Sequence, residues 1–168
     1  MINEMKMSEM HPIITSSIKE NGCFIFYPRG TSMLPTIYPE KDGVELIAAD
    51  NIELYDVILY RRNNGQYVMH RVVGIKNGKL TLCGDNQTAY EKGITADMVI
   101  AKASRIIKPD GTQLECIGKS NALYAKKLRR RLTPLRITRF CKRLVYRIYK
   151  YIFKKGDDKN AESFLKRF

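Results

Sequence analysis

Apolar residues near the start of the chain change from helix-like to strand-like spacing. Between residues 8 and 20 the isoleucines recur at helical spacing, and Asn21-Gly22 supplies a C-terminal stop. The apolar and aromatic run 23–27 has the length and residue types of a strand, and it ends at Pro28. The pattern predicts a lead-in helix within residues 1–22, followed by a first strand.

The middle of the chain consists of short β-type runs separated by turn signals. The predicted strands are 43–48, 56–61, 67–75, 79–83 and 98–107. The breaks between them contain glycine where a positive φ is needed, as in Asn63-Asn64-Gly65 and Lys76-Asn77-Gly78. This pattern predicts an antiparallel, mainly β domain over residues 23–117.

The charge of the chain changes abruptly near Gly118. Residues 1–117 hold 13 basic and 14 acidic side chains, whereas residues 118–168 hold 17 and 3. The net charge of +13 therefore belongs to the C-terminal part of the chain. We place a domain boundary there and treat 118–168 as a basic tail.

The basic tail has the spacing of an amphipathic helix. Its cationic positions follow one another in steps of three or four: Arg136, Arg139, Arg143, Arg147, Lys150 and Lys154. Apolar residues fill the other face, so residues 135–154 could pack on the β domain, lie in an anionic membrane interface or bind nucleic acid. Nucleic acid is the least favoured partner, because no helix-turn-helix pattern precedes the β domain.

Neither a metal site nor a membrane span is evident in the sequence. Cys23, Cys83, Cys116 and Cys141 form no Cys-x-x-Cys pair, and the chain has only two histidines. We expect reduced cysteines and no metal or other cofactor. No export signal and no run of about 18 apolar residues is present. The expected location is the cytoplasm. If the basic tail lies in a membrane interface, we expect peripheral contact at the inner face of the plasma membrane.

Three short segments contain residue types that can do chemistry. Ser32 lies in a turn between Gly30 and Pro35, and the proline fixes its own φ and restricts the backbone of Leu34 before it. His70 lies on a predicted strand, and Asp85 follows in a Gly-Asp-Asn turn. Each segment alone is commonplace, because serines in turns and histidines on strands are usually structural. Their order along the chain is more informative.

The order and spacing of these segments resemble the signal peptidase I family. The chain has Ser-Met-x-Pro-Thr from Ser32, His-Arg-Val-Val-Gly from His70, and Gly-Asp-Asn around Asp85. The resemblance covers about residues 23–107. It is greatest with the branch of archaea, the endoplasmic reticulum and some spore-forming bacteria, in which histidine replaces the general-base lysine. Together with the hairpin pattern, it implies a distorted antiparallel β-barrel-like domain.

The resemblance also implies a role for each matching residue. Ser32 matches the nucleophile and His70 the general base, and Asp85 would support the imidazolium. The implied reaction is serine-type endopeptidase cleavage of a peptide or preprotein, as in signal or leader peptide processing. The backbone N–H of Ser32 would hold part of the oxyanion, within a turn completed by Met33 and Pro35.

Two positions depart from the family pattern. Many bacterial relatives have a hydroxyl residue two positions before the nucleophile, where this chain has Gly30. Thr31 or a backbone group would then complete the oxyanion hole. Histidine-type relatives often carry a second acid shortly after Gly-Asp-Asn, and the candidate here is Glu91. The sequence leaves open whether Asp85 or Glu91 supports the histidine.

We expect no counterpart of the family's N-terminal membrane anchor, and this expectation widens the range of candidate substrates. A cytoplasmic peptide precursor, such as the leader of a ribosomally made and modified peptide, is then as good a candidate as an exported preprotein. The alternative hypothesis is a non-catalytic peptide-binding module that its basic tail recruits to an anionic membrane. A repressor-like DNA-binding protein is a third hypothesis, which depends on charge alone. The joint presence of Ser32, His70 and Asp85 favours the peptidase.

Overall fold

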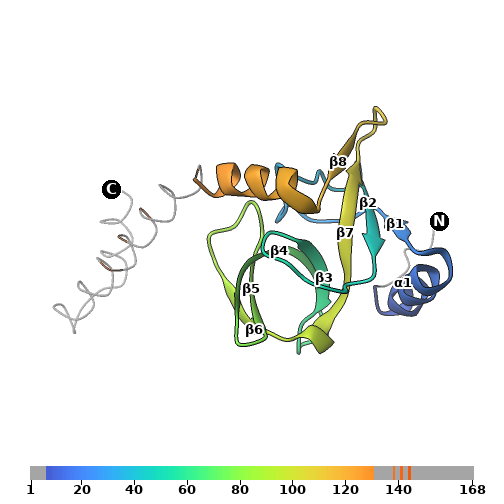
Figure 1. Ribbon diagram of the computed structural model, residues 1–168, viewed down its shortest axis with the longest axis horizontal. Coiled ribbons are helices and arrows are strands. Elements are labelled where there is room, and N and C mark those ends of the chain that lie inside the picture. Colours follow the sequence, from blue (N-terminus) through green and yellow to red (C-terminus); the bar gives the residue numbers. More distant parts are fainter. Residues whose placement is uncertain (1–6, 131–137, 139–140, 142–143, 145–168) are drawn as a thin grey trace, which may run out of the picture. The chain divides into compact units, whose positions relative to one another are not determined.

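The computed structural model describes residues 7–130 together with residues 138, 141 and 144 (Figure 1). Most of the predicted tail helix, residues 135–154, therefore lies outside the described residues. The elements in chain order are α1 (Met7–Asn21), β1 (Phe24–Phe26), β2 (Gly43–Ile47), β3 (Val57–Arg61), β4 (Tyr67–Lys76), β5 (Lys79–Cys83), β6 (Glu91–Ile94), the 3₁₀ helix η1 (Ala96–Met98), β7 (Val99–Ile107) and β8 (Gln113–Glu115). A further helix covers residues 118–130.

All eight strands belong to one antiparallel sheet. The order is β1-β2-β7-β3-β4-β5-β6, and β8 pairs with β7. Figure 1 shows β3, β4, β5 and β6 curling round beside β7. The two end strands, β1 and β6, do not pair with each other in this order, so the sheet is not closed. The mainly β prediction is confirmed, and the barrel-like part of it holds only as far as a curled open sheet.

Most predicted elements match the structure to within two residues at either end. The strand expected over 79–83 coincides with β5, and the one expected over 98–107 begins one residue later, after η1. Two strands were not predicted from the sequence, β6 and β8. Both are short and rich in polar or charged residues, so they lack the apolar alternation by which strands are recognised.

The side chains of β3 and β4 alternate between two apolar cores. Val57, Leu59 and Met69 belong to the core that also contains Ile14 of α1. Ile58, Tyr60 and Val72 belong to a second core, on the side of β5 and β6. Because successive residues of a strand point to opposite faces, His70 and Arg71 are directed to different sides of β4. Neighbours in sequence thus end up in different environments.

The helix over residues 118–130 begins where the charge of the sequence changes. By its contacts, however, the chain divides into two compact units at residues 1–128 and 129–168. Within the first unit this helix buries Asn121, Ala125 and Leu128. The predicted boundary at Gly118 therefore marks the start of a helix that belongs in part to the β domain. No helix in the described part of the chain is both long and apolar enough to cross a membrane.

Candidate active site

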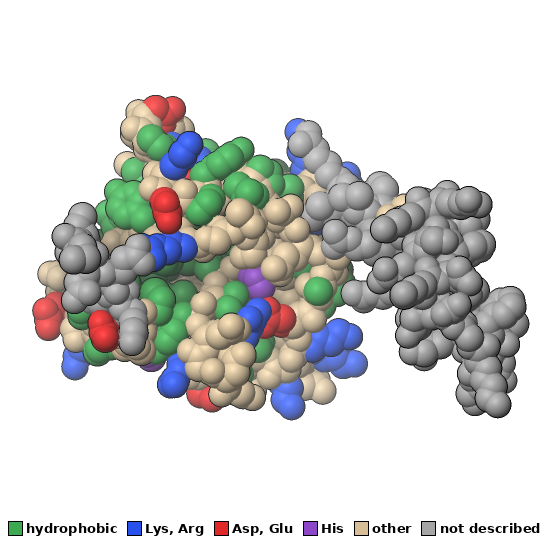
Figure 2. Space-filling model, turned by 180° about the vertical axis from the view of Figure 1, so that it is seen from behind, with side chains coloured by type: hydrophobic (Ala, Val, Ile, Leu, Met, Phe, Trp, Pro, Cys, Tyr) green, Lys and Arg blue, Asp and Glu red, His purple; other side chains and the backbone are tan. Residues whose placement is uncertain are grey.

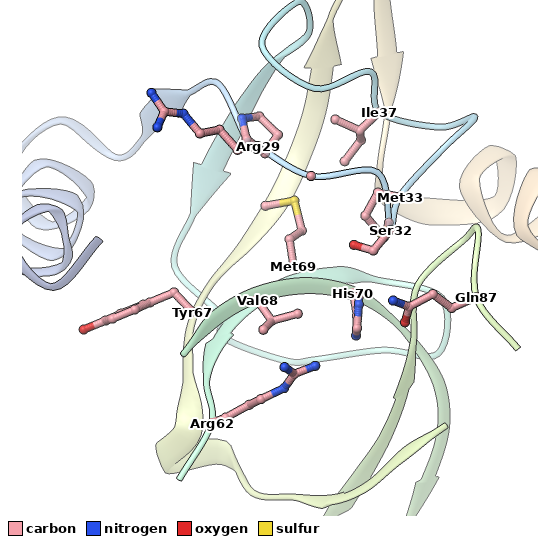
Figure 3. Close-up of a pocket in the computed structure, with 12 residues that line it drawn as sticks. Arg29, Ser32, Met33, Ile37, Arg62, Tyr67, Val68, Met69, His70 and Gln87 are labelled. Atoms are coloured by element: carbon pink, nitrogen blue, oxygen red, sulfur yellow. The ribbon is translucent and has the colours of Figure 1, made fainter. Parts of the chain in front are cut away.

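A pocket of about 270 Å³ opens next to the turn that contains Ser32. Figure 2 shows a histidine in a hollow on one face of the molecule, with acidic and basic side chains beside it. The walls of the pocket come from the serine turn, the start of β4 and the loop after β5 (Figure 3). The lining residues are Pro28, Arg29, Gly30, Ser32, Met33, Ile37, Arg62, Tyr67, Val68, Met69, His70 and Gln87.

The serine turn is held by its own backbone and by a buried side chain. Gly30 has a φ of 90°, a conformation that side chains disfavour, so a glycine before the serine has a conformational reason. The N–H of Leu34 donates to the carbonyl of Thr31 at 3.3 Å. Met33, only 4% exposed, anchors the turn in the first core. With Met33 buried in this way, Ser32 beside it lines the pocket.

The Gly-Asp-Asn segment clamps this turn from the other side. The backbone N–H of Asn86 donates to the carbonyl of Ser32 at 2.8 Å, and the Asn86 side chain donates to the carbonyl of Thr31 at 3.3 Å. A Cβ atom on Gly84 would lie 2.6 Å from the Ser32 carbonyl oxygen. Only glycine allows the two segments to come this close. The spacing of the two motifs in the sequence therefore has a direct packing explanation.

His70 is buried, at 1% exposure, and its Nδ1 atom has two polar neighbours. Nδ1 lies 3.1 Å from Oε1 of Glu91 and 3.2 Å from the hydroxyl of Tyr60. Arg62 in turn donates from Nε to Oε2 of Glu91 at 2.8 Å, and its terminal nitrogen bonds Oε1. Glu91 is thus hydrogen-bonded on both carboxylate oxygens.

Burial lowers the pKa of His70 below its ordinary value of 6.5, although the negative charge of Glu91 opposes this shift. Burial would raise the pKa of Glu91, but the hydrogen bonds from Arg62 and Tyr60 outweigh it and lower the pKa. Near neutral pH the pair is therefore a neutral imidazole beside a carboxylate. A carboxylate only accepts hydrogen bonds, so the contact with Glu91 favours the tautomer with the proton on Nδ1 and the lone pair on Nε2.

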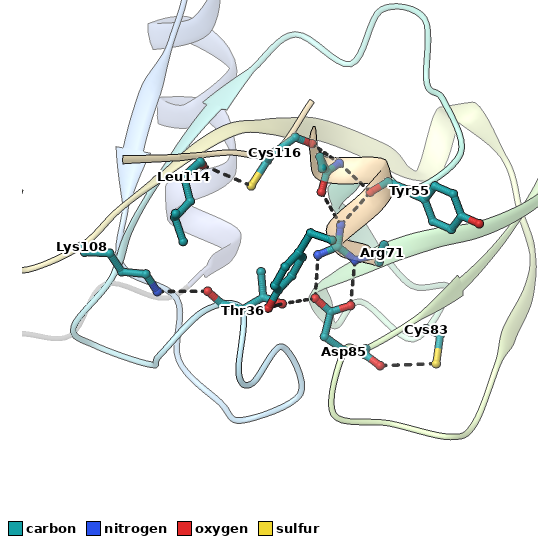
Figure 4. A network of polar contacts seen from close by, with 11 residues as sticks. Thr36, Tyr55, Arg71, Cys83, Asp85, Lys108, Leu114 and Cys116 are labelled. Atoms are coloured by element: carbon teal, nitrogen blue, oxygen red, sulfur yellow. Dashed lines mark hydrogen bonds and ion pairs between the residues drawn. The ribbon is translucent and has the colours of Figure 1, made fainter. Parts of the chain in front are cut away.

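Asp85 lies in a different network, in which its carboxylate pairs with Arg71 (Figure 4). Its two oxygens accept from Nε and a terminal nitrogen of Arg71 at 2.8 and 2.7 Å, and Thr36 donates to one of them. Arg71 also donates to Asn121 at 2.7 Å. The predicted support of the imidazolium by Asp85 therefore does not come from direct contact, because the hydrogen bonds of Asp85 recorded in the described residues go to Arg71 and Thr36. Of the two acids that the sequence left open, the structure places Glu91 against His70.

The alternation of β4 explains why the two acids separate. His70 and Arg71 are adjacent, so their side chains leave the strand in opposite directions. β6, which pairs with β5, brings Glu91 to the histidine side. The loop directly after β5 brings Asp85 to the arginine side. Asp85 therefore acts on His70 only through space, as a charge that raises the pKa of the ring.

Ser32 and His70 line the same pocket from different elements, the turn after β1 and the middle of β4. Figure 3 shows the Ser32 side chain directed toward the space above the His70 ring. Within the described residues the structure records no hydrogen bond between them. In sites without substrate, catalytic hydrogen bonds are often long or poorly aligned and tighten when substrate binds.

Sequence reasoning did not identify Tyr60 and Arg62 as site residues. Both come from the β3–β4 hairpin. Tyr60 is the last of four consecutive buried residues in β3, so its sequence context indicates only a strand residue. Arg62 directly follows β3, and the one sequence signal is that it comes after Arg61, since successive residues of an extended chain point to opposite sides. Cys23, Cys83, Cys116 and Cys141 form no disulfide, and no cluster of three or more metal-binding side chains occurs in the described part of the chain.

Comparisons with known proteins provide no further assignment. The chain matches no protein-family model, no curated protein and no solved structure. The site is therefore interpreted from its own geometry and from the motifs of the sequence.

Proposed function

We propose that this protein is a serine endopeptidase of the signal peptidase type, with Ser32 as nucleophile, His70 as general base and Glu91 as the carboxylate that orients the base. The observation that supports it most is the shared pocket of Ser32 and His70, together with the contact of the ring's Nδ1 atom with Glu91. A serine hydroxyl needs an adjacent base, and that base is commonly oriented by a third group.

The proposed reaction proceeds by acyl transfer. Nε2 of His70 takes the hydroxyl proton as Oγ of Ser32 bonds to the scissile carbonyl carbon, and the same proton then passes to the leaving amine as the C–N bond breaks. A water molecule, deprotonated by the same ring, hydrolyses the ester and releases Ser32. Glu91 stabilises the imidazolium in both halves. The Ser32 N–H and the neighbouring Thr31 are the candidate donors for the oxyanion.

The proposed substrate is an extended peptide or the leader segment of a precursor. The apolar part of the pocket, formed by Met33, Ile37 and Met69, would receive a side chain next to the scissile bond. Among the strands that the structure describes, β1 pairs only with β2. It leads into Pro28 and Arg29 at the pocket, so its other edge could hold such a peptide by strand addition.

The test uses a defined mixture of peptides, with mass spectrometry of the products. Wild-type protein should generate specific fragments, Ser32→Ala should generate none, and Ser16→Ala, which removes an exposed hydroxyl from α1, should match the wild type. Equal fragments from wild type and Ser32→Ala would rule out Ser32 catalysis. The alternative function, a non-catalytic peptide binder, predicts that peptides are retained but not cleaved by either protein.

A further inference from the structure

Arg62 makes the most complete set of contacts to the carboxylate beside His70. Two of its nitrogens bond the two oxygens of Glu91, an arrangement in which a guanidinium fixes both the position and the rotation of a carboxylate. The remaining terminal nitrogen donates to Oε1 of Gln66 at 2.8 Å. The guanidinium is therefore held on two sides.

The β3–β4 turn fixes the backbone from which Arg62 projects. The N–H of Arg62 donates to the carbonyl of Gln66 at 2.8 Å, and its carbonyl accepts from Gly65 at 2.9 Å. Gly65 has a φ of 84°, which this turn requires. A hairpin that joins two strands of the sheet thus also orients the charged group next to the pocket.

Glu91 needs this support because its own element supplies little. It begins β6, a strand of four residues in which only Ile94 is buried. The Glu91 side chain keeps 25% exposure, so without a partner its carboxylate could turn toward water. The hydroxyl of Tyr60, which lies 3.2 Å from Nδ1 of His70, also hydrogen-bonds Glu91 and so limits the movement of the Glu91 carboxylate.

We propose that Arg62 is a positioning residue: by holding Glu91 against Nδ1, it keeps His70 in the tautomer whose Nε2 lone pair is directed to Ser32. The contribution of Arg62 to catalysis rests on the proposed peptidase function. Its effect on the tautomer of His70 does not. With the proton on Nε2 instead, the ring would present a donor to the serine hydroxyl and could not act as its base.

The test is the tautomer of His70, measured from the ¹⁵N shifts of its ring in the intact protein above the pKa of the ring. The chain has two histidines, so His11 gives an internal reference in the same spectrum. Wild type should show the Nδ1–H form. Arg62→Gln should shift the population toward Nε2–H, and Arg62→Lys should lie between them, because lysine keeps the charge but loses the two-pronged geometry.

Arg105→Gln is the matched control. Arg105 donates from Nε to Oε1 of Glu45 at 2.8 Å, so this variant breaks an arginine–glutamate pair of the same length elsewhere in the sheet. It should leave the tautomer unchanged. A wild-type tautomer in folded Arg62→Gln or Arg62→Lys overturns the proposal, as does the Nε2–H form in wild type.

Peptide cleavage by the same variants separates this inference from the proposed function. If Arg62 positions Glu91 in a working peptidase, kcat should fall roughly 10-fold or more in Arg62→Gln, with partial recovery in Arg62→Lys. A shifted tautomer in a protein that never cleaves peptides would uphold the role of Arg62 and reject the peptidase. Unchanged kcat in an active enzyme with a shifted tautomer would overturn the catalytic meaning of the arrangement.

Discussion

Nδ1 of His70 lies 3.1 Å from Oε1 of Glu91, a residue from a strand that does not pair with the strand of His70. β5 lies between β4 and β6 in the sheet. The contact forms because the curl of the sheet brings Glu91 of β6 to the histidine side of β4. Asp85, closer to His70 in sequence, instead neutralises Arg71 on the other side. The two acids should therefore differ in what their removal does.

Glu91→Gln is expected to affect activity, and Asp85→Asn to affect stability. Glu91→Gln removes the charge that stabilises the imidazolium, so kcat should fall by roughly 10²–10⁴ while the fold persists. Asp85→Asn leaves Arg71 buried without its anion and should lower the free energy of unfolding by about 3–5 kcal/mol. Peptide turnover and urea denaturation of both variants measure the two effects. The reverse pattern would return the role of third residue to Asp85.

The pH dependence of cleavage should follow the ring of His70. Burial lowers the pKa of this ring below 6.5, and only the neutral ring can accept the serine proton. Activity should therefore be full at neutral pH and fall on acidification, with its midpoint below 6.5. Glu91→Gln removes a negative charge that raises this pKa, so the midpoint should move to lower pH. A profile of kcat/KM against pH for both proteins measures it, and a midpoint above 6.5 would contradict the assignment of the base.

Gly84→Ala should displace the serine turn. The added Cβ atom would lie 2.6 Å from the carbonyl oxygen of Ser32, so one of the two segments must move. We expect a loss of about 1–3 kcal/mol in stability. Cleavage should fall by up to roughly 100-fold, because the nucleophile is misplaced.

Gly74→Ala is the control for this prediction. Its Cβ atom would meet Thr81 at 3.5 Å, an ordinary contact, and Gly74 needs no positive φ. Circular dichroism melts and peptide turnover of both variants give the comparison. If Gly84→Ala cleaves as fast as Gly74→Ala, the close packing of the two motifs is not needed for the site.

Much of the fold could be predicted from the sequence, because its strands have apolar alternation and its turns have glycine. The pocket's two principal residues could also be named, since the motifs of Ser32 and His70 are local. The sequence names Asp85 and Glu91, but it could not predict which of the two contacts His70. That contact depends on β6, which has no apolar pattern, and on a register shift between Leu80 and Thr81 where β5 meets β6. The role of Arg62 depends on the same pairing, so it too became visible only in the folded chain.

The helix over residues 118–130 determines where the chain can be cut. Asn121 is 5% exposed and accepts from Arg71, while its amide donates to the carbonyls of Tyr55 and Cys116 at 3.1 and 2.5 Å. A protein ending at residue 117 loses this residue and leaves buried polar groups without partners. It should therefore melt at a lower temperature than the full chain. A protein ending at residue 130 should melt like the full chain and should keep the peptidase activity.

The variant ending at residue 130 also provides a clean test of membrane binding by the basic tail. It removes 12 of the 17 basic residues that follow residue 117 and leaves the compact unit that ends at Leu128 intact. If the tail binds anionic lipid, the full chain should float with vesicles of phosphatidylserine and phosphatidylcholine, and the shortened protein should not. Neither should float with phosphatidylcholine alone. Equal flotation of both proteins would show that the tail is not the membrane contact. The rate of peptide cleavage by the same two proteins would show whether the tail affects the proposed activity.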